Sequence, residues 1–176
     1  MCYNTSLGDL MKFRKFKEDS KMQKKFIHSL LQVEDIRNIF ECFSYDYNYL
    51  KRFEKTNHYY HNYYVKEEND YIGWISYGFS SNTKEAELLY CLLPEYRGWG
   101  HIDRMIEKME RLLYEQGVQK TILEIPRDHE ASLRVAMRMQ YEIASNEGSC
   151  LVCQKDLVKK FGEKHLQKKR KTIVEN

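Results

Sequence analysis

The chain has 176 residues, of which 42% are hydrophobic and 31% charged, and its formal net charge is +3. These values fit one soluble globular domain with a single core and exclude a largely disordered protein. Because no segment approaches the roughly 20 uninterrupted apolar residues of a membrane span, and the first residues lack the apolar core of a signal peptide, we expect a cytoplasmic protein without a membrane partner.

The N-terminal part of the chain predicts a strand at about residues 11–16 followed by two helices. Ser20 or Asp19 would cap the first helix, and its apolar face would consist of Met22, Phe26, Ile27 and Leu30. The stripe of the second, shorter helix is Ile36, Ile39, Phe40 and Phe43. The tyrosine-rich segment 45–64 that follows carries no clear periodicity, and we assign it no structure.

The middle of the chain predicts a β-meander that leads into a helix. Residues 61–80 favour a hairpin with its turn at 68–70, and a third strand covers about 86–93 and ends at Pro94. The helix after Gly100 has the clearest periodicity in the chain. Its apolar positions are Ile102, Met105, Ile106, Met109, Leu112 and Leu113.

The remaining elements alternate between strands and one further helix. Gly117 stands where a glycine C-cap belongs, and a strand at 121–125 and a helix at 130–139 follow. Two last strands at 141–144 and 149–156 flank a turn at 146–148. Residues 158–176 form a basic appendage, in which lysines and arginine cluster at 168–171.

The five cysteines predict neither disulfides nor a metal site. They are Cys2, Cys42, Cys91, Cys150 and Cys153. Their odd number and irregular spacing suit reduced thiols. The Cys150-x-x-Cys153 pair could be half a zinc site or a redox pair, but no second CxxC or neighbouring histidine pair completes it. We expect these two residues to lie in a strand, without a metal.

The most informative stretch is PEYRGWGHI at residues 94–102, where a strand stops, glycines follow Arg97 and a helix begins. The first backbone N–H groups of a helix have no internal partner, and the peptide dipoles leave a partial positive charge there. Glycine permits close approach, so this junction favours an anion such as phosphate. A glycine-rich turn before a helix can also be a simple connection between two elements, without a binding role.

The order of elements and two motifs resemble the GNAT superfamily of acyl-CoA-dependent N-acyltransferases. PEYRGWGHI is similar to its Arg/Gln-x-x-Gly-x-Gly/Ala signature, and HEASLRVAMRMQYE at 129–142 to its Asn-x-x-Ser/Ala signature with a later Gly-Phe/Tyr. The resemblance implies an α/β (α+β) fold with a mixed, largely antiparallel central sheet flanked by helices. It also implies a single domain at residues 1–157 with a basic tail at 158–176.

The resemblance further implies that acetyl-CoA is the co-substrate and that specific positions bind it. The backbone after Arg97 would hold the pyrophosphate, the strand end would pair with the pantetheine, and Ser132 would lie near the pantetheine end. The expected binding residues are Leu92, Leu93, Arg97, Gly98, Trp99, Gly100, His101, Ile102 and Ser132.

The chain departs from the family pattern at four positions. Ile102 stands where a last Gly or Ala is usual, Asp103 where a small residue is common, His129 for Asn and Gln140 for Gly. A carboxylate about 4 Å from a pyrophosphate charge costs roughly 1 kcal/mol in water and about 4 near a protein surface. Asp103 therefore opposes the anion, and Arg97, Arg104 and His101 offset it.

Acyl transfer to an amine needs a base, and the resemblance to the histone-acetylating branch of the family makes Glu87 the candidate. A solvated strand-edge glutamate is the alternative, and Glu85 shares its face. For the proton donor, Ala136 stands where the family often has Tyr. Tyr90, Tyr141, a tyrosine of the 45–64 segment or water could substitute. Cys91 as a covalent nucleophile is less consistent with a buried strand cysteine.

We expect an active N-acetyltransferase that acts by direct transfer on a primary amine, which is a small molecule or a peptide. The alternative from another class is a degenerate GNAT-fold binding or regulatory protein with weak or no acyl-CoA binding, which Ile102 and Asp103 favour. A third interpretation places function in the basic tail, but nucleic acid is an unlikely partner because the body of the protein is not basic. The chain would be a monomer or homodimer.

Overall fold

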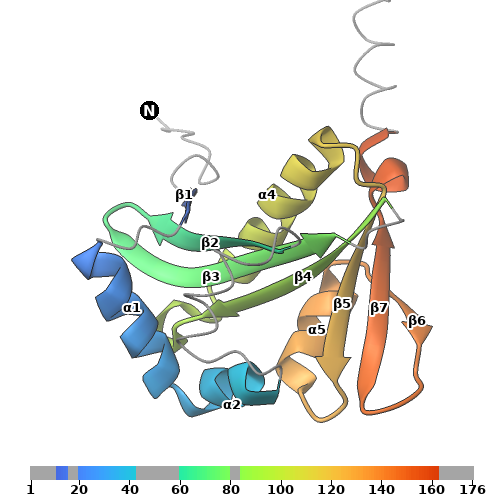
Figure 1. Cartoon of the computed structure of the whole chain (residues 1–176). Helices are drawn as coiled ribbons and strands as arrows, with labels where there is room; N and C mark the ends of the chain where they lie inside the picture. The colour runs from blue at the N-terminus through green and yellow to red at the C-terminus, as the bar shows by residue number, and fades with distance from the viewer. Residues whose placement is uncertain (1–10, 16–19, 43–59, 80–83, 163–176) are drawn as a thin grey trace, which may run out of the picture. The chain divides into compact units, whose positions relative to one another are not determined.

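The computed structural model describes residues 11–15, 20–42, 60–79 and 84–162, and its strands form one seven-stranded sheet in the order β1-β2-β3-β4-β5-β7-β6 (Figure 1). The pairs β1–β2, β2–β3, β5–β7 and β6–β7 are antiparallel, and β4–β5 is parallel. The expected fold class, a mixed and largely antiparallel sheet flanked by helices, is confirmed.

The elements follow the predicted order along the chain. The strands are β1 (Met11–Lys15), β2 (Tyr60–Glu67), β3 (Asp70–Phe79), β4 (Glu85–Leu92), β5 (Lys120–Pro126), β6 (Glu142–Ser145) and β7 (Cys150–Asp156). The helices are α1 (Lys21–Gln32), α2 (Glu34–Cys42), α4 (His101–Glu115) and α5 (Glu130–Arg138), with a 3-10 turn η2 (Pro94–Tyr96) and a π-helical turn η3 (Val158–Gly162). No helix of the described segments combines the length and the apolar character needed to cross a membrane.

The chain divides into two compact units. Unit 1 takes Met1–Gly78 with Leu89–Met105, and unit 2 takes Phe79–Leu88 with Ile106–Asn176. Strand β4 and helix α4 therefore contribute residues to both units. The predicted boundary between a domain at 1–157 and a tail at 158–176 stays a prediction.

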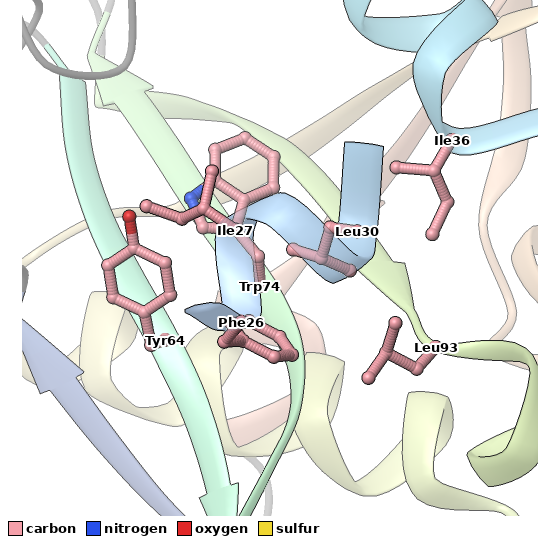
Figure 2. Close-up of a cluster of buried hydrophobic side chains, with 7 residues drawn as sticks. All are labelled: Phe26, Ile27, Leu30, Ile36, Tyr64, Trp74 and Leu93. Carbon is pink, nitrogen blue, oxygen red and sulfur yellow. The ribbon is translucent and has the colours of Figure 1, made fainter. Parts of the chain in front are cut away.

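The core of unit 1 is a cluster that α1 and α2 form with β2, β3 and the end of β4, shown in Figure 2. Its members are Phe26, Ile27, Leu30, Ile36, Tyr64, Trp74 and Leu93. Of the residues predicted for the stripe of α2, Ile36 is in this cluster, whereas only the backbone of Ile39 and Phe40 is described. Phe43 and residues 45–59 lie outside the described residues.

Helix α1 begins as predicted, but its buried face differs at the first turn. The Ser20 hydroxyl accepts a hydrogen bond from Gln23 N–H at 3.3 Å and caps the helix. Met22, expected on the apolar face, is 60% exposed, and Gln23 is buried in its place. The Gln23 amide donates to Lys15 O at 3.1 Å and to the Tyr71 hydroxyl at 3.3 Å. These bonds compensate the burial of a polar side chain, which periodicity alone does not anticipate.

The buried face of helix α4 is wide, and a charged residue lies at one side of it. Met105, Ile106, Met109 and Leu113 are buried as predicted, whereas Leu112 is 38% exposed. Glu110 at the opposite side of this face is fully buried. A helix turns about 100° per residue, so burying position 110 rotates position 112 toward solvent. The prediction for Leu112 was wrong because Glu110 has ionic partners inside unit 2.

The C-terminal elements of unit 2 converge on Glu110. Its carboxylate accepts from Lys155 Nζ at 3.0 Å on both oxygens, from Lys160 Nζ at 2.8 Å and from the Tyr141 hydroxyl at 2.8 Å. Lys160 belongs to η3, whose Phe161 is buried against Tyr114 with ring centroids 5.4 Å apart. The first residues after β7 are therefore packed on unit 2.

Candidate functional site

The loop between β4 and α4 is built on two glycines in the left-handed region. Gly98 has φ 81° and Gly100 has φ 76°, which L side chains rarely adopt. A Cβ added at either position would meet nothing within 4 Å. The glycines are thus required by backbone conformation rather than by crowding, and space remains open beside this part of the backbone.

The helix that follows the loop presents its first amides at this open face. The first backbone hydrogen bond of α4 runs from Arg104 N–H to Gly100 O at 3.2 Å. The backbone amides of residues 101–103 come before this bond and are not part of the hydrogen-bond pattern within the helix. Together with the helix dipole they favour a negatively charged group. The backbone conformation of the loop is compatible with the phosphate site that the sequence predicts, and that site stays a prediction.

The Arg97 side chain contacts protein oxygens on both sides of the loop. Its Nε donates to Leu92 O at 3.1 Å, and its two Nη atoms donate to the Asp35 carboxylate of α2 at 2.7 and 3.3 Å. Its backbone N–H donates to Pro94 O at 3.1 Å. The guanidinium thereby ties the end of β4 and the loop to α2.

A second ion cluster, absent from the sequence predictions, lies at the first turn of α4. Glu67, the last residue of β2, accepts from Arg104 Nη1 at 2.8 Å and Nη2 at 3.4 Å, and it pairs with His101 Nδ1. Arg104 Nη2 is also 2.6 Å from His101 Nδ1. Arg104 and His101, which we expected to offset Asp103, both contact Glu67. The position of Glu67 beside the predicted turn at 68–70 did not indicate these ion pairs, because they depend on tertiary structure.

The other predicted residues of the loop and strand end all lie in unit 1. Leu92 and Leu93 are buried, and Leu93 N–H donates to Ile72 O at 3.0 Å, continuing the β3–β4 edge. Ile102 is half-buried, whereas Trp99 is 77% exposed. The structure thus brings Leu92 to Ile102 together as one continuous strand-loop-helix junction.

Glu87 and Ser132 lie in unit 2. Glu87 is half-buried in β4 and is the last residue that pairs with β5, opposite Ile122. Glu85 shares its face and forms an ion pair with Lys120 at 2.9 Å. Leu88 is buried and points to the face opposite Glu87, because side chains alternate along a strand.

Helix α5 carries the second motif and satisfies both of its own ends. His129 Nδ1 accepts from Ser132 N–H at 3.3 Å, as an N-cap side chain does. At the other end Gln140 has φ 63°, its N–H donates to Met137 O, and Tyr141 N–H donates to Ala136 O at 2.9 Å. This pattern of bonds is a Schellman motif, in which the left-handed position is usually glycine.

Comparison with protein families decides the identity of this fold. The model of the family described as "Acetyltransferase (GNAT) domain" matches residues 4–142. The chain belongs to this GNAT family. The resemblance noted from the two motifs is therefore confirmed at the level of the family.

Individual GNAT relatives are more distant. Acetyltransferase plu1384 of Photorhabdus laumondii is 30% identical over 71 residues, which are 40% of this chain and 49% of that protein. The match therefore spans about half the length of that curated relative.

Solved structures share the fold at lower identity. The PaiA N-acetyltransferase of Thermoplasma acidophilum, in complex with coenzyme A, has a TM-score of 0.60 and 16% identity, covering 83% of this chain and 98% of that one. Spermidine N-acetyltransferase of Vibrio cholerae, in complex with CoA and spermine, has a TM-score of 0.60 and 14% identity, covering 83% and 94%.

The departures from GNAT motifs have local explanations in the structure. His129 stands where the motif has Asn, and it caps α5 through a ring nitrogen. Gln140 stands where the motif has Gly and adopts a left-handed conformation, which costs a non-glycine residue roughly 1–2 kcal/mol. Both residues of the second motif thus take part in ending α5, one at each end of the helix.

The candidates for proton donor and nucleophile differ in their surroundings. The Tyr141 hydroxyl is 2.8 Å from Glu110 and 3.0 Å from Thr121 and belongs to the buried network of unit 2. Tyr90 is half-buried. Burial raises the pKa of the Cys91 thiol to about 12, although nearby Arg97 lowers it. Cys91 therefore remains a thiol at neutral pH, which argues against covalent transfer through it.

The described residues contain no metal-binding cluster. No group of three or more His, Cys, Asp or Glu side chains gathers within the described segments. Cys150 and Cys153 are free thiols in β7. Their separation by three positions places them on opposite faces of the strand, which disfavours a shared metal or a disulfide.

Proposed function

We propose that this protein transfers an acetyl group from acetyl-CoA to a primary amine by direct transfer. The observation that supports the proposal is the glycine loop at 98–100, whose conformation and open surroundings suit a phosphate at the start of α4 in a chain of the GNAT family. Acetyl-CoA would supply the activated acetyl thioester. The CoA-bound structures of related fold support this choice of co-substrate.

The binding residues take distinct roles in this proposal. The backbone amides from Gly98 to Ile102, including those of Trp99 and His101, hold the pyrophosphate. Arg97 acts as a positioning residue, because its guanidinium is bonded to Asp35 and Leu92 O. Leu92 and Leu93 contribute backbone groups to the pantetheine, and Ser132 lies near its end.

Glu87 is the proposed general base. The acceptor ammonium must lose a proton before its nitrogen can attack the acetyl carbon, and Glu87 takes that proton through a water molecule. A C–N bond then forms as the C–S bond breaks, the attacking nitrogen loses its second proton to water, and the departing thiolate gains a proton from water. Glu85, on the same face of β4, forms an ion pair with Lys120 at 2.9 Å.

A thermal-shift titration with acetyl-CoA and with CoA tests binding directly. A ligand at 100 times its dissociation constant stabilises the folded state by about 2.7 kcal/mol, which raises the melting temperature of a domain of this size by several degrees. We expect such a shift for both ligands. No shift at millimolar ligand contradicts the proposal.

Thiol release with a panel of primary amines then identifies the acceptor, and the panel includes polyamines because one related structure holds spermine. Glu87→Gln should lower kcat by about 100-fold or more, in line with the usual contribution of a general base. Glu85→Gln, on the same face of β4, is the matched control and should retain activity. An unchanged rate and pH profile in Glu87→Gln would refute the role of Glu87.

A second candidate is a GNAT-fold binding or regulatory protein that binds acyl-CoA weakly or not at all. It is favoured by the carboxylates of Glu67 and Asp103 at the first turn of α4, where they oppose a bound anion. A folded protein that shows no shift with either CoA ligand and no thiol release with any amine would support this candidate.

A further inference from the structure

Trp99 is the most exposed of the large hydrophobic side chains in the described residues. It is 77% exposed, whereas Trp74, the other tryptophan of the chain, is 4% exposed in the core of unit 1. Indole rings contribute large apolar areas when buried, and an exposed one commonly marks a contact surface. The position of Trp99 between Gly98 and Gly100 places this surface within the proposed phosphate loop.

The loop holds the tryptophan on a defined backbone. The flanking glycines adopt φ 81° and 76°, and the preceding Arg97 is fixed by hydrogen bonds to Leu92 O and Asp35. A Cβ added at either glycine would meet nothing within 4 Å, so other residues do not crowd the loop backbone at these two positions. A ligand that stacks on the indole therefore costs little conformational entropy of the loop.

We propose that Trp99 stacks on the adenine of the acyl donor and selects CoA thioesters over donors that carry phosphopantetheine alone. This inference rests on the proposed function. In CoA the adenine base is joined to the pyrophosphate by a single ribose. A pyrophosphate held by the loop amides therefore brings the base close to residue 99. Every base has a π-face, and stacking on an aromatic side chain contributes about 1–3 kcal/mol per base.

The test measures dissociation constants by isothermal titration calorimetry for CoA and for 4′-phosphopantetheine, which lacks the 3′-phosphoadenosine and the second phosphate of the pyrophosphate. The proteins are the wild type, Trp99→Ala and Trp99→Phe. Met22→Ala on α1 is the matched control, because it removes another exposed apolar side chain. All variants are first checked for unchanged melting temperature.

Trp99→Ala should raise the dissociation constant of CoA by about 5- to 100-fold, as expected for a lost stacked base. Trp99→Phe should restore most of the affinity, and the affinity for 4′-phosphopantetheine should be equal in all four proteins. Quenching of the exposed Trp99 fluorescence by CoA, but not by 4′-phosphopantetheine, is a second expected signature.

Two results overturn the inference while leaving the proposed function intact. One is an unchanged affinity for CoA in Trp99→Ala. The other is an equal loss of affinity for both ligands, which would mean that Trp99 shapes the loop rather than contacts the base. If the wild type binds neither ligand, the proposed function itself fails.

Discussion

Glu67 in unit 1 and Glu110 in unit 2 each bind two basic side chains, yet their environments differ. Glu110 is fully buried, and two lysines and a tyrosine hydroxyl satisfy its oxygens. The Glu67 side chain is 12% exposed, and its partners His101 and Arg104 lie on the first turn of α4. The Glu110 cluster stabilises the core of unit 2, whereas the Glu67 cluster sets the charge beside the proposed anion site.

The largest expected effect comes from breaking the buried cluster. Glu110→Ala leaves Lys155 and Lys160 without their carboxylate, and the loss of one partner of a buried ion pair costs about 3–5 kcal/mol. Urea denaturation should show this decrease in the free energy of unfolding. Glu67→Ala should cost only about 1 kcal/mol, since its cluster is nearer to water. Equal losses in the two variants would contradict the distinction between the clusters.

A smaller effect, on binding rather than stability, is expected from Glu67→Gln. Removing this negative charge leaves Arg104 and His101 to act on a bound anion, so the affinity for CoA should rise about fivefold at low salt. The gain should shrink at high salt because of screening. Glu107→Gln, which removes an exposed carboxylate farther along α4, is the control. Weaker CoA binding in Glu67→Gln would show that Glu67 positions the site instead.

Relieving backbone strain should separate stability from binding. Gln140 and Glu68 are the non-glycine residues with positive φ among those described, at 63° and 51°. Gln140→Gly should raise the free energy of unfolding by about 1 kcal/mol, and Glu68→Gly should act in the same direction. Thermal unfolding measures both variants, and the CoA affinity of Gln140→Gly should equal that of the wild type. A less stable Gln140→Gly would mean that its side chain makes compensating contacts.

At neutral pH the smallest effect concerns Cys91. With its pKa raised by burial from 9.0 to about 12, the folded protein keeps the neutral thiol while the unfolded chain ionises. Its contribution to stability is complete below pH 9 and is lost as the pH rises toward 12. Cys91→Ala should therefore flatten the alkaline decline in stability and leave kcat unchanged.

Alkylation with iodoacetamide at pH 8 checks the same thiol by mass spectrometry. Cys91 should remain unmodified in the folded protein, because the thiolate is the reactive form. Rapid labelling of Cys91, or loss of activity in Cys91→Ala, would reopen the possibility of covalent transfer.

Local patterns in the sequence predicted most of the fold. The apolar spacing in 101–115 defines α4, and turn residues at 68–70 define the β2–β3 hairpin, since such signals depend on neighbours along the chain. The prediction failed at Met22 and Leu112. In both cases a polar residue, Gln23 or Glu110, takes a buried position with partners from distant elements.

The sequence by itself determined the GNAT motifs, the order of elements and the glycine-containing junction before α4, because these depend on residue type and local spacing. Only the tertiary structure decided which partners the charged side chains take. Arg97 contacts Asp35, and Arg104 and His101 contact Glu67, over separations of 62, 37 and 34 residues. Ion pairs form between groups that folding brings within a few ångströms, and the spacing of residues along the chain does not encode that distance.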